Sequence, residues 1–192
     1  RGKLTMTETH PAGLLAADAT DPPLIPASFT AAFPYSNGQY AWTTAQAAKF
    51  EWVAHISVTG DPVAASRARI EDVERFDATP AQFPAFAAER LHLRHSCGIA
   101  YADLTNMRLV VDALEAAKMG AEPWMLFVAW WWGPVTPPSQ LAVQSELAKF
   151  GTDVPLERIA ACQFLPAGPG RNYDTSVVYQ PHVLHRPQGW PS

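Results

Sequence analysis

The chain has 192 residues, of which 48% are hydrophobic and 17% charged, and its formal net charge is −4. At roughly 150 residues per domain, this length predicts one domain with enough apolar material for a packed core. The low charge, together with 7 Trp, 5 Tyr and 9 Phe, excludes a highly charged disordered tail. The acidic balance argues against a dedicated nucleic-acid binder. The sequence has no apolar run of about 18 residues, so we expect no membrane span. The first 30 residues also lack the basic start and apolar run of a signal peptide.

Short apolar runs alternate with longer amphipathic stretches along the chain. The runs predict strands at Leu14–Asp18, Phe29–Tyr35, Trp52–Val58, Ala68–Glu74, Cys97–Ala102, Trp124–Trp131, Ile159–Phe164 and Thr175–Tyr179. The stretches between them predict helices from Thr43 or Thr44 to Phe50, from Thr79 to Leu91, from Thr105 or Asn106 to Met119, and from Ser139 to Phe150. Strands separated by helices indicate a parallel sheet, and both an open doubly wound sheet and a closed barrel fit. No glycine-rich nucleotide loop follows any of the strands.

Two of the predicted helices carry clear end signals. Thr79 is placed to cap one helix, with Pro80 at its first position and Gln82 completing a capping box. Gly120 is placed to end the next one, whose apolar stripe is expected to be Leu109, Val110, Leu114 and Ala117. We expect residues 1–13 to be an extension, with Arg1 to Thr5 left over from cloning. Residues 181–192, rich in Pro and His, are expected to be an irregular tail.

The densest group of carboxylates is the segment 71–74 (EDVE), with Asp77 just after it. Side chains alternate along a strand, so Asp72 and Glu74 point to the same face at the strand's carboxyl end. In a parallel β/α barrel, active sites form at that end. Two adjacent carboxyl groups repel each other when both are ionised, so one keeps a raised pKa and can act as a general acid. Cleavage of a glycosidic bond needs such a pair. Alternatively, these side chains are solvated or pair with Arg67, Arg69 or Arg75.

Aromatic residues form a second candidate feature. Trp130, Trp131 and Trp132 follow one another at a strand end, so at least one points inward and one outward. Together with Tyr35, Tyr40 and Trp42 they could present flat rings to a sugar. They are also compatible with ordinary core packing or a protein interface.

Cysteine and histidine patterns give no cofactor site. Cys97 and Cys162 lack the spacing of a metal clip and are expected as two buried thiols, with one long-range disulfide as the alternative. No zinc-binding motif includes any of the six histidines, and no nucleophile elbow is present. We therefore expect no metal and no other cofactor.

The chain resembles the glycoside hydrolase family 25-like domains of actinobacteria and their phages, which are related to lysozyme-type muramidases. The resemblance spans about Leu14 to Val178. The segments that carry it are Leu15–Asp18 (LAAD), Ile25–Ala27 (IPA), Tyr35–Trp42 (YSNGQYAW), Ile70–Glu74 (IEDVE), Thr79–Gln82 (TPAQ), Leu126–Ala129 (LFVA), Cys162–Phe164 (CQF) and Tyr173–Ser176 (YDTS).

This resemblance implies a single-domain α/β fold over residues 14–180, a trimmed or irregular (β/α)8 barrel of the TIM type. It implies that Glu74 is the general acid, and that Asp72 orients the substrate's N-acetyl group or stabilises the charged transition state. Asp18 and Asp174 would complete the acidic cluster. The residues expected to contact substrate are Tyr35, Trp130, Trp131, Gln163 and Tyr173.

The implied function is hydrolysis of peptidoglycan or another glycan at the cell wall, outside the cell or in a virion. Trp130 stands where related domains keep a polar residue. That difference favours an alternative, a catalytically inactive domain that binds glycan or phage structural subunits in a tail or capsid surface. A lectin-like binder of host surfaces is a third possibility.

Overall fold

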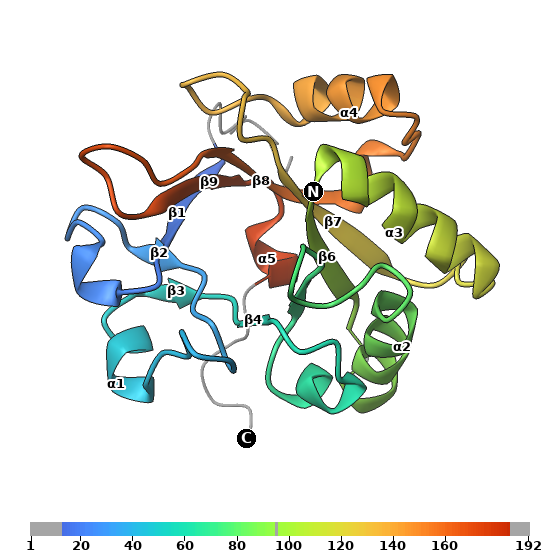
Figure 1. Cartoon of the computed structure of the whole chain (residues 1–192), viewed down its shortest axis with the longest axis horizontal. Helices are drawn as coiled ribbons and strands as arrows, with labels where there is room; N and C mark the ends of the chain where they lie inside the picture. The colour runs from blue at the N-terminus through green and yellow to red at the C-terminus, as the bar shows by residue number, and fades with distance from the viewer. Residues whose placement is uncertain (1–12, 95, 185–192) are drawn as a thin grey trace, which may run out of the picture.

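The computed structural model describes residues 13–94 and 96–184, so Arg1–Thr5 and the tail from residue 185 lie outside the described part. Nine strands in the described part form one sheet in the order β3-β2-β1-β9-β8-β7-β6-β5-β4 (Figure 1). The strands are β1 Leu14–Asp18, β2 Ala31–Ala32, β3 Trp52–Val53, β4 Ile56–Ser57, β5 Ile70–Asp72, β6 Gly98–Asp103, β7 Trp124–Ala129, β8 Ile159–Leu165 and β9 Asp174–Val178.

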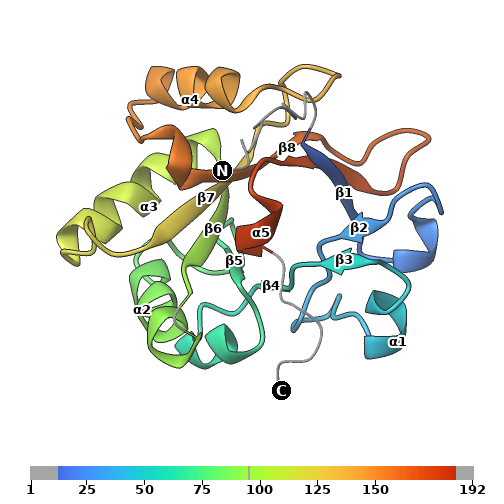
Figure 2. The same cartoon turned by 180° about the vertical axis from the view of Figure 1, so that it is seen from behind.

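The sheet curls round until its two edges meet. The edge strands β3 and β4 are separated in the chain only by Ala54 and His55. Beyond β2, Tyr35 bridges Ile56 of β4, which pairs in turn with β5. The curvature is visible from both sides (Figures 1 and 2). The predicted mixed α/β domain is therefore confirmed, with a curled sheet whose edges adjoin.

One strand departs from the expected parallel arrangement. β9 runs antiparallel to both β1 and β8, whereas the other named pairs are parallel. The connection from β8 to β9, residues 166–173, contains no helix. A parallel neighbour needs a crossover of about a dozen or more residues, so this short connection returns the chain in the opposite direction.

Helices cover only part of the curled sheet. They are α1 Thr44–Ala47, α2 Phe83–Arg94, α3 Leu104–Ala116, α4 Gln140–Lys149 and α5 Pro181–Leu184, and the 3-10 turns are Pro22–Leu24, Pro62–Ser66 and Leu156–Arg158. α2, α3 and α4 lie along the side formed by β5 to β8, while the side formed by β1 to β3 carries only α1 and a short turn (Figures 1 and 2). The expectation of a trimmed architecture agrees with this uneven coverage.

The start of α2 differs from the prediction. Gln82 reaches back to Thr79, whose backbone N–H and hydroxyl both donate to Gln82 Oε1 at 2.8 Å, but this closes a turn that precedes the helix. A helix capped by Thr79 would place Pro84 at its fifth position, where its ring clashes with the preceding turn. Beginning at Phe83 places Pro84 in the first turn, where no N–H is needed.

The ends of α3 also differ from the prediction. Asp103 caps it, because its Oδ1 accepts the backbone N–H groups of Thr105 at 2.7 Å and Asn106 at 2.8 Å. The helix ends before Gly120, and Lys118 takes the left-handed conformation with φ of 59°. Leu109 is 51% exposed and so does not belong to the apolar stripe. The buried face is Leu104, Met107, Val110, Val111 and Leu114. By contrast, the predicted helix start at Thr43 is confirmed, where Gln46 completes a capping box, and so is the predicted start at Ser139.

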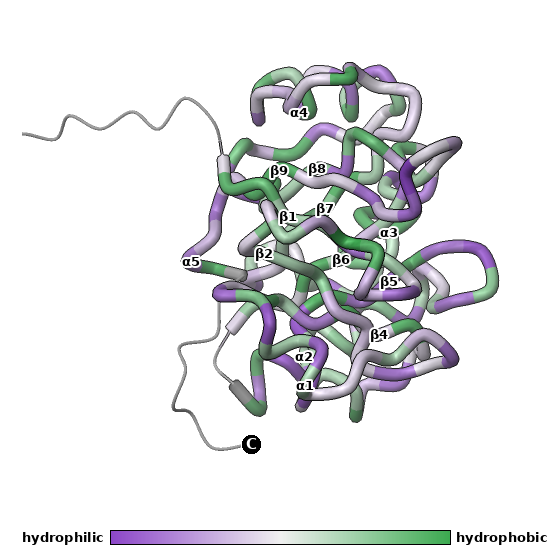
Figure 3. Tube along the Cα trace, turned by 90° about the vertical axis from the view of Figure 1, so that its left-hand side faces the viewer, coloured by the Kyte–Doolittle hydropathy of each residue, from purple (hydrophilic) through white to green (hydrophobic). Residues whose placement is uncertain are grey.

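An apolar layer packs against each face of the sheet, one inside the curl and one outside it. Inside the curl, the rings of Phe33, Tyr101 and Phe127 pack together, with Phe127 4.7 Å from Phe33 and 4.9 Å from Tyr101 between centroids. Outside, strand side chains pack against α2, α3 and α4. Hydrophobic residues accordingly concentrate in the strands and hydrophilic ones in the outer loops (Figure 3). Cys97 belongs to the inner layer and Cys162 to the outer one, and both are free, which confirms two buried thiols.

The amino-terminal end of the strands is closed by α5. Val183 packs against the inner apolar layer, and the Arg69 guanidinium donates to the Val183 carbonyl. Residues 181–184, expected to be irregular, therefore form a short helix with a packing role. Among the described residues, no helix has the length and apolarity needed to cross a membrane. The inward-facing polar side chains lie at the opposite, carboxyl-terminal end of the strands.

Candidate active site

Along several strands, the inward-facing residues change from apolar to polar toward the carboxyl end. On β1, Ala16 is followed on the same face by Asp18. On β5, Ile70 is followed by Asp72, and on β8, Ala161 is followed by Gln163. The carboxyl ends of parallel strands lie at one end of a curled sheet, so these residues form one polar layer. The rings of Phe33 and Phe127 lie in the apolar layer next to it.

Asp18 and Asp174 form a pair across two antiparallel strands. They are direct partners in the register between β1 and β9, and a hydrogen bond joins their carboxyl groups. Asp174 also accepts the backbone N–H of Ala167. Burial, followed by the charge of Asp174, raises the pKa of Asp18 well above its ordinary value. Asp18 therefore holds its proton to a higher pH than an exposed aspartic acid does.

The carboxyl groups of Asp72 and Glu74 lie close enough to this pair for the charges to affect one another. Asp72 is only 4% exposed, and burial, then the charge of Glu74, raises its pKa well above the ordinary value. Burial, followed by the charges of Asp103, Asp77 and Asp174, raises the pKa of Glu74 to about 7. The charges of Asp72 and Glu74 act in turn on Asp18. The four carboxyl groups predicted from the sequence therefore converge.

Within the described residues, no arginine is among the groups that shift the pKa of the two central carboxyl groups. Every charged group that shifts the pKa of Asp72 or Glu74 is itself acidic. Asp72 Oδ1 and Glu74 Oε1 are buried and have no hydrogen-bond partner within the described residues. The alternative of pairing with Arg67, Arg69 or Arg75 is therefore not supported. Buried acceptors normally have a partner, so these two oxygens are unusual in lacking one.

The arrangement can supply both an acid and an anion. Interacting carboxyl groups release their protons in separate steps that belong to the group as a whole. A group that titrates in this way holds protonated and ionised carboxyl groups together over part of the pH range, and the pKa of about 7 at Glu74 keeps a proton donor available around neutrality. These are the two forms of carboxyl group that acid-catalysed cleavage of a glycosidic bond needs.

Two tyrosines and a glutamine line the same cluster. Burial, followed by carboxylate charges, raises the pKa of Tyr35 and Tyr101 well above the ordinary value, so both phenols stay neutral donors. The Tyr101 hydroxyl donates to Gln163 Oε1, which also accepts Trp131 Nε1–H at 3.1 Å. The structure thus brings Tyr35, Gln163 and Trp131 to the cluster.

Tyr101 and Asp103 were not among the residues predicted for the site. Tyr101 sits in an apolar run on β6, and Asp103 ends that strand. Both share a face with Ile99, so the alternation of a six-residue strand is the signal that could have identified them. Asp103 is the charged group with the largest effect on the pKa of Glu74.

Two predicted substrate contacts lie elsewhere. Trp130 packs against the layer between sheet and helices, because the alternation along β7 turns Ala129 inward and the next residue outward. Tyr173 packs against the outer face near β1 and β2, with its ring 5.6 Å from that of Phe29. Neither is placed with the carboxyl groups.

Glu71 lies on the opposite face of β5 from the cluster. It is fully buried, and its Oε1 accepts the backbone N–H of Gly60 at 2.6 Å. Burial raises its pKa to about 7, although the bonds from Gly60 and Ser57 act in the other direction. Glu71 is therefore a second buried acid, outside the group that faces the inside of the curl.

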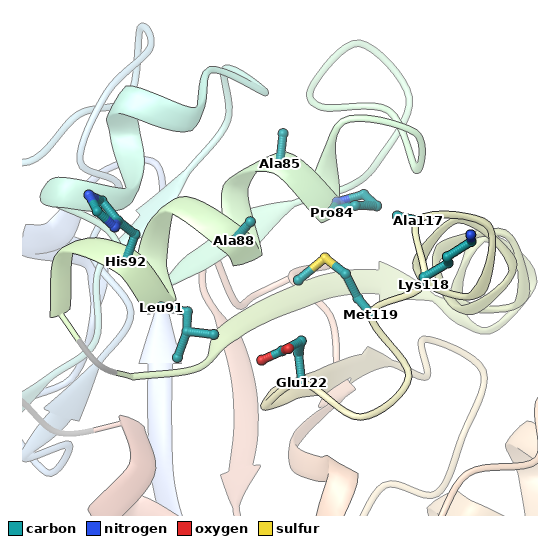
Figure 4. Close-up of a pocket in the computed structure, with 9 residues that line it drawn as sticks. All are labelled: Pro84, Ala85, Ala88, Leu91, His92, Ala117, Lys118, Met119 and Glu122. Carbon is teal, nitrogen blue, oxygen red and sulfur yellow. The ribbon is translucent and has the colours of Figure 1, made fainter.

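A separate groove of about 600 Å³ lies between α2 and the loop that leads from α3 to β7 (Figure 4). Its lining is Pro84, Ala85, Ala88, Leu91, His92, Ala117, Lys118, Met119 and Glu122. These residues lie outside the sheet, and Leu91 and Met119 shortly precede β6 and β7, toward the amino-terminal end of the strands. The groove is therefore distinct from the carboxyl cluster. Within residues 13–94 and 96–184, no three His, Cys, Asp or Glu side chains are arranged to hold a metal ion.

The fold has counterparts among solved structures. An uncharacterized protein of B. stearothermophilus superposes with a TM-score of 0.58 at 14% identity, covering 86% of this chain and 96% of its own. A bacterial lysozyme from Streptomyces coelicolor superposes with a TM-score of 0.53 at 12% identity, covering 91% of this chain and 96% of its own. No protein-family model matches the sequence. No curated protein matches it either.

At these identities the likeness shows the fold alone. The chain has a fold similar to that of a bacterial lysozyme over nearly its whole length. The coarser form of the resemblance, a lysozyme-like mixed α/β fold, is confirmed, whereas the roles of individual residues stay predictions.

Proposed function

We propose that this protein is a glycoside hydrolase that cleaves peptidoglycan, with Glu74 as the general acid. The observation that carries the proposal is the convergence of four carboxyl groups, among them buried Asp72 and Glu74 oxygens without hydrogen-bond partners. The lysozyme-like fold supports the same chemistry by analogy. Peptidoglycan as the substrate rests on the sequence resemblance to muramidase-related domains.

In the proposed reaction, protonated Glu74 transfers its proton to the glycosidic oxygen as the bond from that oxygen to the anomeric carbon breaks. Positive charge develops on the sugar ring, and the anionic form of Asp72 stabilises it or orients the substrate's N-acetyl group. Water then adds to the anomeric carbon, and its proton returns to the carboxylate of Glu74. Tyr35, held neutral by burial and by the surrounding carboxylates, would donate a hydrogen bond to the bound sugar.

The test is the release of reducing ends from purified peptidoglycan. Glu74→Gln removes the proton donor but keeps the side-chain shape, so activity should fall by about 100-fold or more. Glu115→Gln, on exposed α3 surface, is the matched control and should leave activity unchanged. Circular dichroism establishes that both variants fold. Wild-type activity in the Glu74 variant would exclude the assignment.

A non-catalytic glycan-binding protein is the second candidate, and the exposed tryptophans favour it. Trp132 is 58% exposed, and Trp131 contacts Gln163 beside the carboxyl cluster. Such a protein would bind a cell-wall glycan, or a phage structural subunit, without turnover. Retention on insoluble peptidoglycan with no reducing ends released, over hours and from pH 4 to 8, would favour this candidate over the hydrolase.

A further inference from the structure

The turn that directly follows Glu74 exposes a phenylalanine. Phe76 is 90% exposed, the largest exposed fraction among the large hydrophobic side chains of the described residues. Large apolar side chains normally contribute to folding by burial, and this one makes no such contribution. Its position, two residues beyond the proposed general acid, places it at the rim of the carboxyl cluster.

The backbone at Phe76 is held in a conformation that phenylalanine rarely adopts. Its φ is +81°, in the left-handed region where glycine is usual and a bulky residue is an outlier. Two hydrogen bonds fix the turn: Asp77 N–H donates to the Glu74 carbonyl at 3.1 Å, and Ala78 N–H donates to the Asp72 carbonyl at 3.1 Å. The same residues that carry the central carboxyl groups therefore hold the strained turn in place.

The side chain of Arg75 covers one face of the exposed Phe76 ring. Its guanidinium carbon lies 4.8 Å from the centroid of the Phe76 ring, a cation–π contact. A planar cation over one face leaves the opposite face of the ring to solvent. The turn thus presents a flat apolar surface beside the acid.

Exposed aromatic rings also occur two strands away on the same end of the sheet. Trp131 and Trp132 follow β7, and Trp131 reaches Gln163 in the cluster. Because β6 alone separates β5 from β7, aromatic surface borders the carboxyl cluster on two sides. Flat rings next to an acid–anion pair suit the apolar face of a pyranose.

We propose that Phe76 is a carbohydrate-binding platform at the rim of the carboxyl cluster, on whose free face a pyranose ring of the glycan stacks. The proposal rests on the proposed hydrolase function for the identity of the glycan. A strained backbone conformation occurs mainly at functional sites, and it persists where the surrounding structure fixes it. Here that structure is the turn anchored on Asp72 and Glu74. The sugar whose glycosidic oxygen meets Glu74 is the one placed nearest the platform.

The test uses a soluble peptidoglycan tetrasaccharide of alternating N-acetylglucosamine and N-acetylmuramic acid, titrated calorimetrically into Glu74→Gln protein so that no turnover occurs. Adding Phe76→Gly should weaken binding by about tenfold, the order of an aromatic stacking contact. Adding Phe76→Trp should restore it to within about twofold of the parent. Leu109→Ala, an exposed apolar side chain on α3, is the control and should change nothing.

Thermal stability separates a binding role from a structural one. Glycine adopts positive φ without strain, so Phe76→Gly should leave the melting temperature unchanged or raise it while glycan binding weakens. Equal binding by the parent and Phe76→Gly would overturn the platform and leave the hydrolase proposal intact. Absence of both binding and cleavage in the wild type would overturn the hydrolase proposal and the platform with it. Dimerisation of the wild type that is lost in Phe76→Gly, with binding unchanged, would identify a protein interface in place of the platform.

Discussion

Replacing Glu71 by glutamine should stabilise the protein at alkaline pH and not at acidic pH. The side chain is fully buried on the outer face of β5, and burial raises its pKa to about 7 from the ordinary value of 4.5. Between these two values the folded state binds a proton that the unfolded state has released. Stability contributed by this proton is complete below pH 4.5 and is lost as the pH rises through 7.

The magnitude follows from the gap between the two pKa values. Each pH unit of difference is worth about 1.4 kcal/mol, so the gap corresponds to about 3 kcal/mol of lost stability at pH 8.5. Glutamine carries no charge at any pH, and its oxygen can still accept the Gly60 N–H. Between pH 4.5 and pH 8.5, the difference in free energy of unfolding between Glu71→Gln and the wild type should therefore change in favour of the variant. The size of this change should approach the figure given above.

Urea unfolding followed by tryptophan fluorescence, at intervals from pH 4.5 to 8.5, measures the difference in free energy of unfolding. The matched control is Glu115→Gln on exposed α3 surface, whose difference from the wild type should not vary with pH. Asp18 and Glu74 titrate in both proteins and cancel in the comparison, whereas Asp72, whose pKa the charge of Glu71 also raises, adds to the difference in the same direction. A Glu71→Gln difference that stayed constant across this range would refute the reasoning.

Three further predictions concern activity and packing. Hydrolysis should decline as the pH rises above about 7, because Glu74 must be protonated, and a rate that stayed level to pH 9 would contradict this. Asp103→Asn keeps a good helix cap but removes the charge with the largest effect on the pKa of Glu74, so the alkaline limb of the pH–rate profile should move to lower pH. Gly98→Ala would bring a Cβ within 2.8 Å of the Ala87 Cα in α2 and should cost about 1–3 kcal/mol in urea unfolding. Gly168→Ala, which meets no atom within 4 Å, should be near neutral.

The positions of the four carboxyl groups could be predicted because they depend only on local features. Asp18 ends an apolar run, and Asp72 and Glu74 are two residues apart at the end of another. Strand ends and alternation are readable in a single sequence. The same alternation predicted that neighbouring tryptophans point to opposite faces, as Trp130 and Trp131 do.

Features that depend on distant parts of the chain could not be predicted. A strand such as β9 has the same apolar pattern in either direction, so its antiparallel placement emerges only from the connection that precedes it. Which tryptophan faces inward depends on the register at Ala129. Tyr101 lies in an apolar run that is typical of a buried core strand. Its place beside Gln163 depends on the packing of strands that are distant in the sequence, which the run itself does not indicate.

The pairing of β1 with β9 places the site under an unusual kinetic constraint. Asp18 and Asp174 are register partners although they stand 156 positions apart in the chain. Contacts of such large sequence separation slow folding, since the loop between them must be ordered first. During synthesis, β1 leaves the ribosome before β9 and lacks this neighbour until β9 has also emerged. The acidic cluster is therefore complete only after β9 has paired with β1.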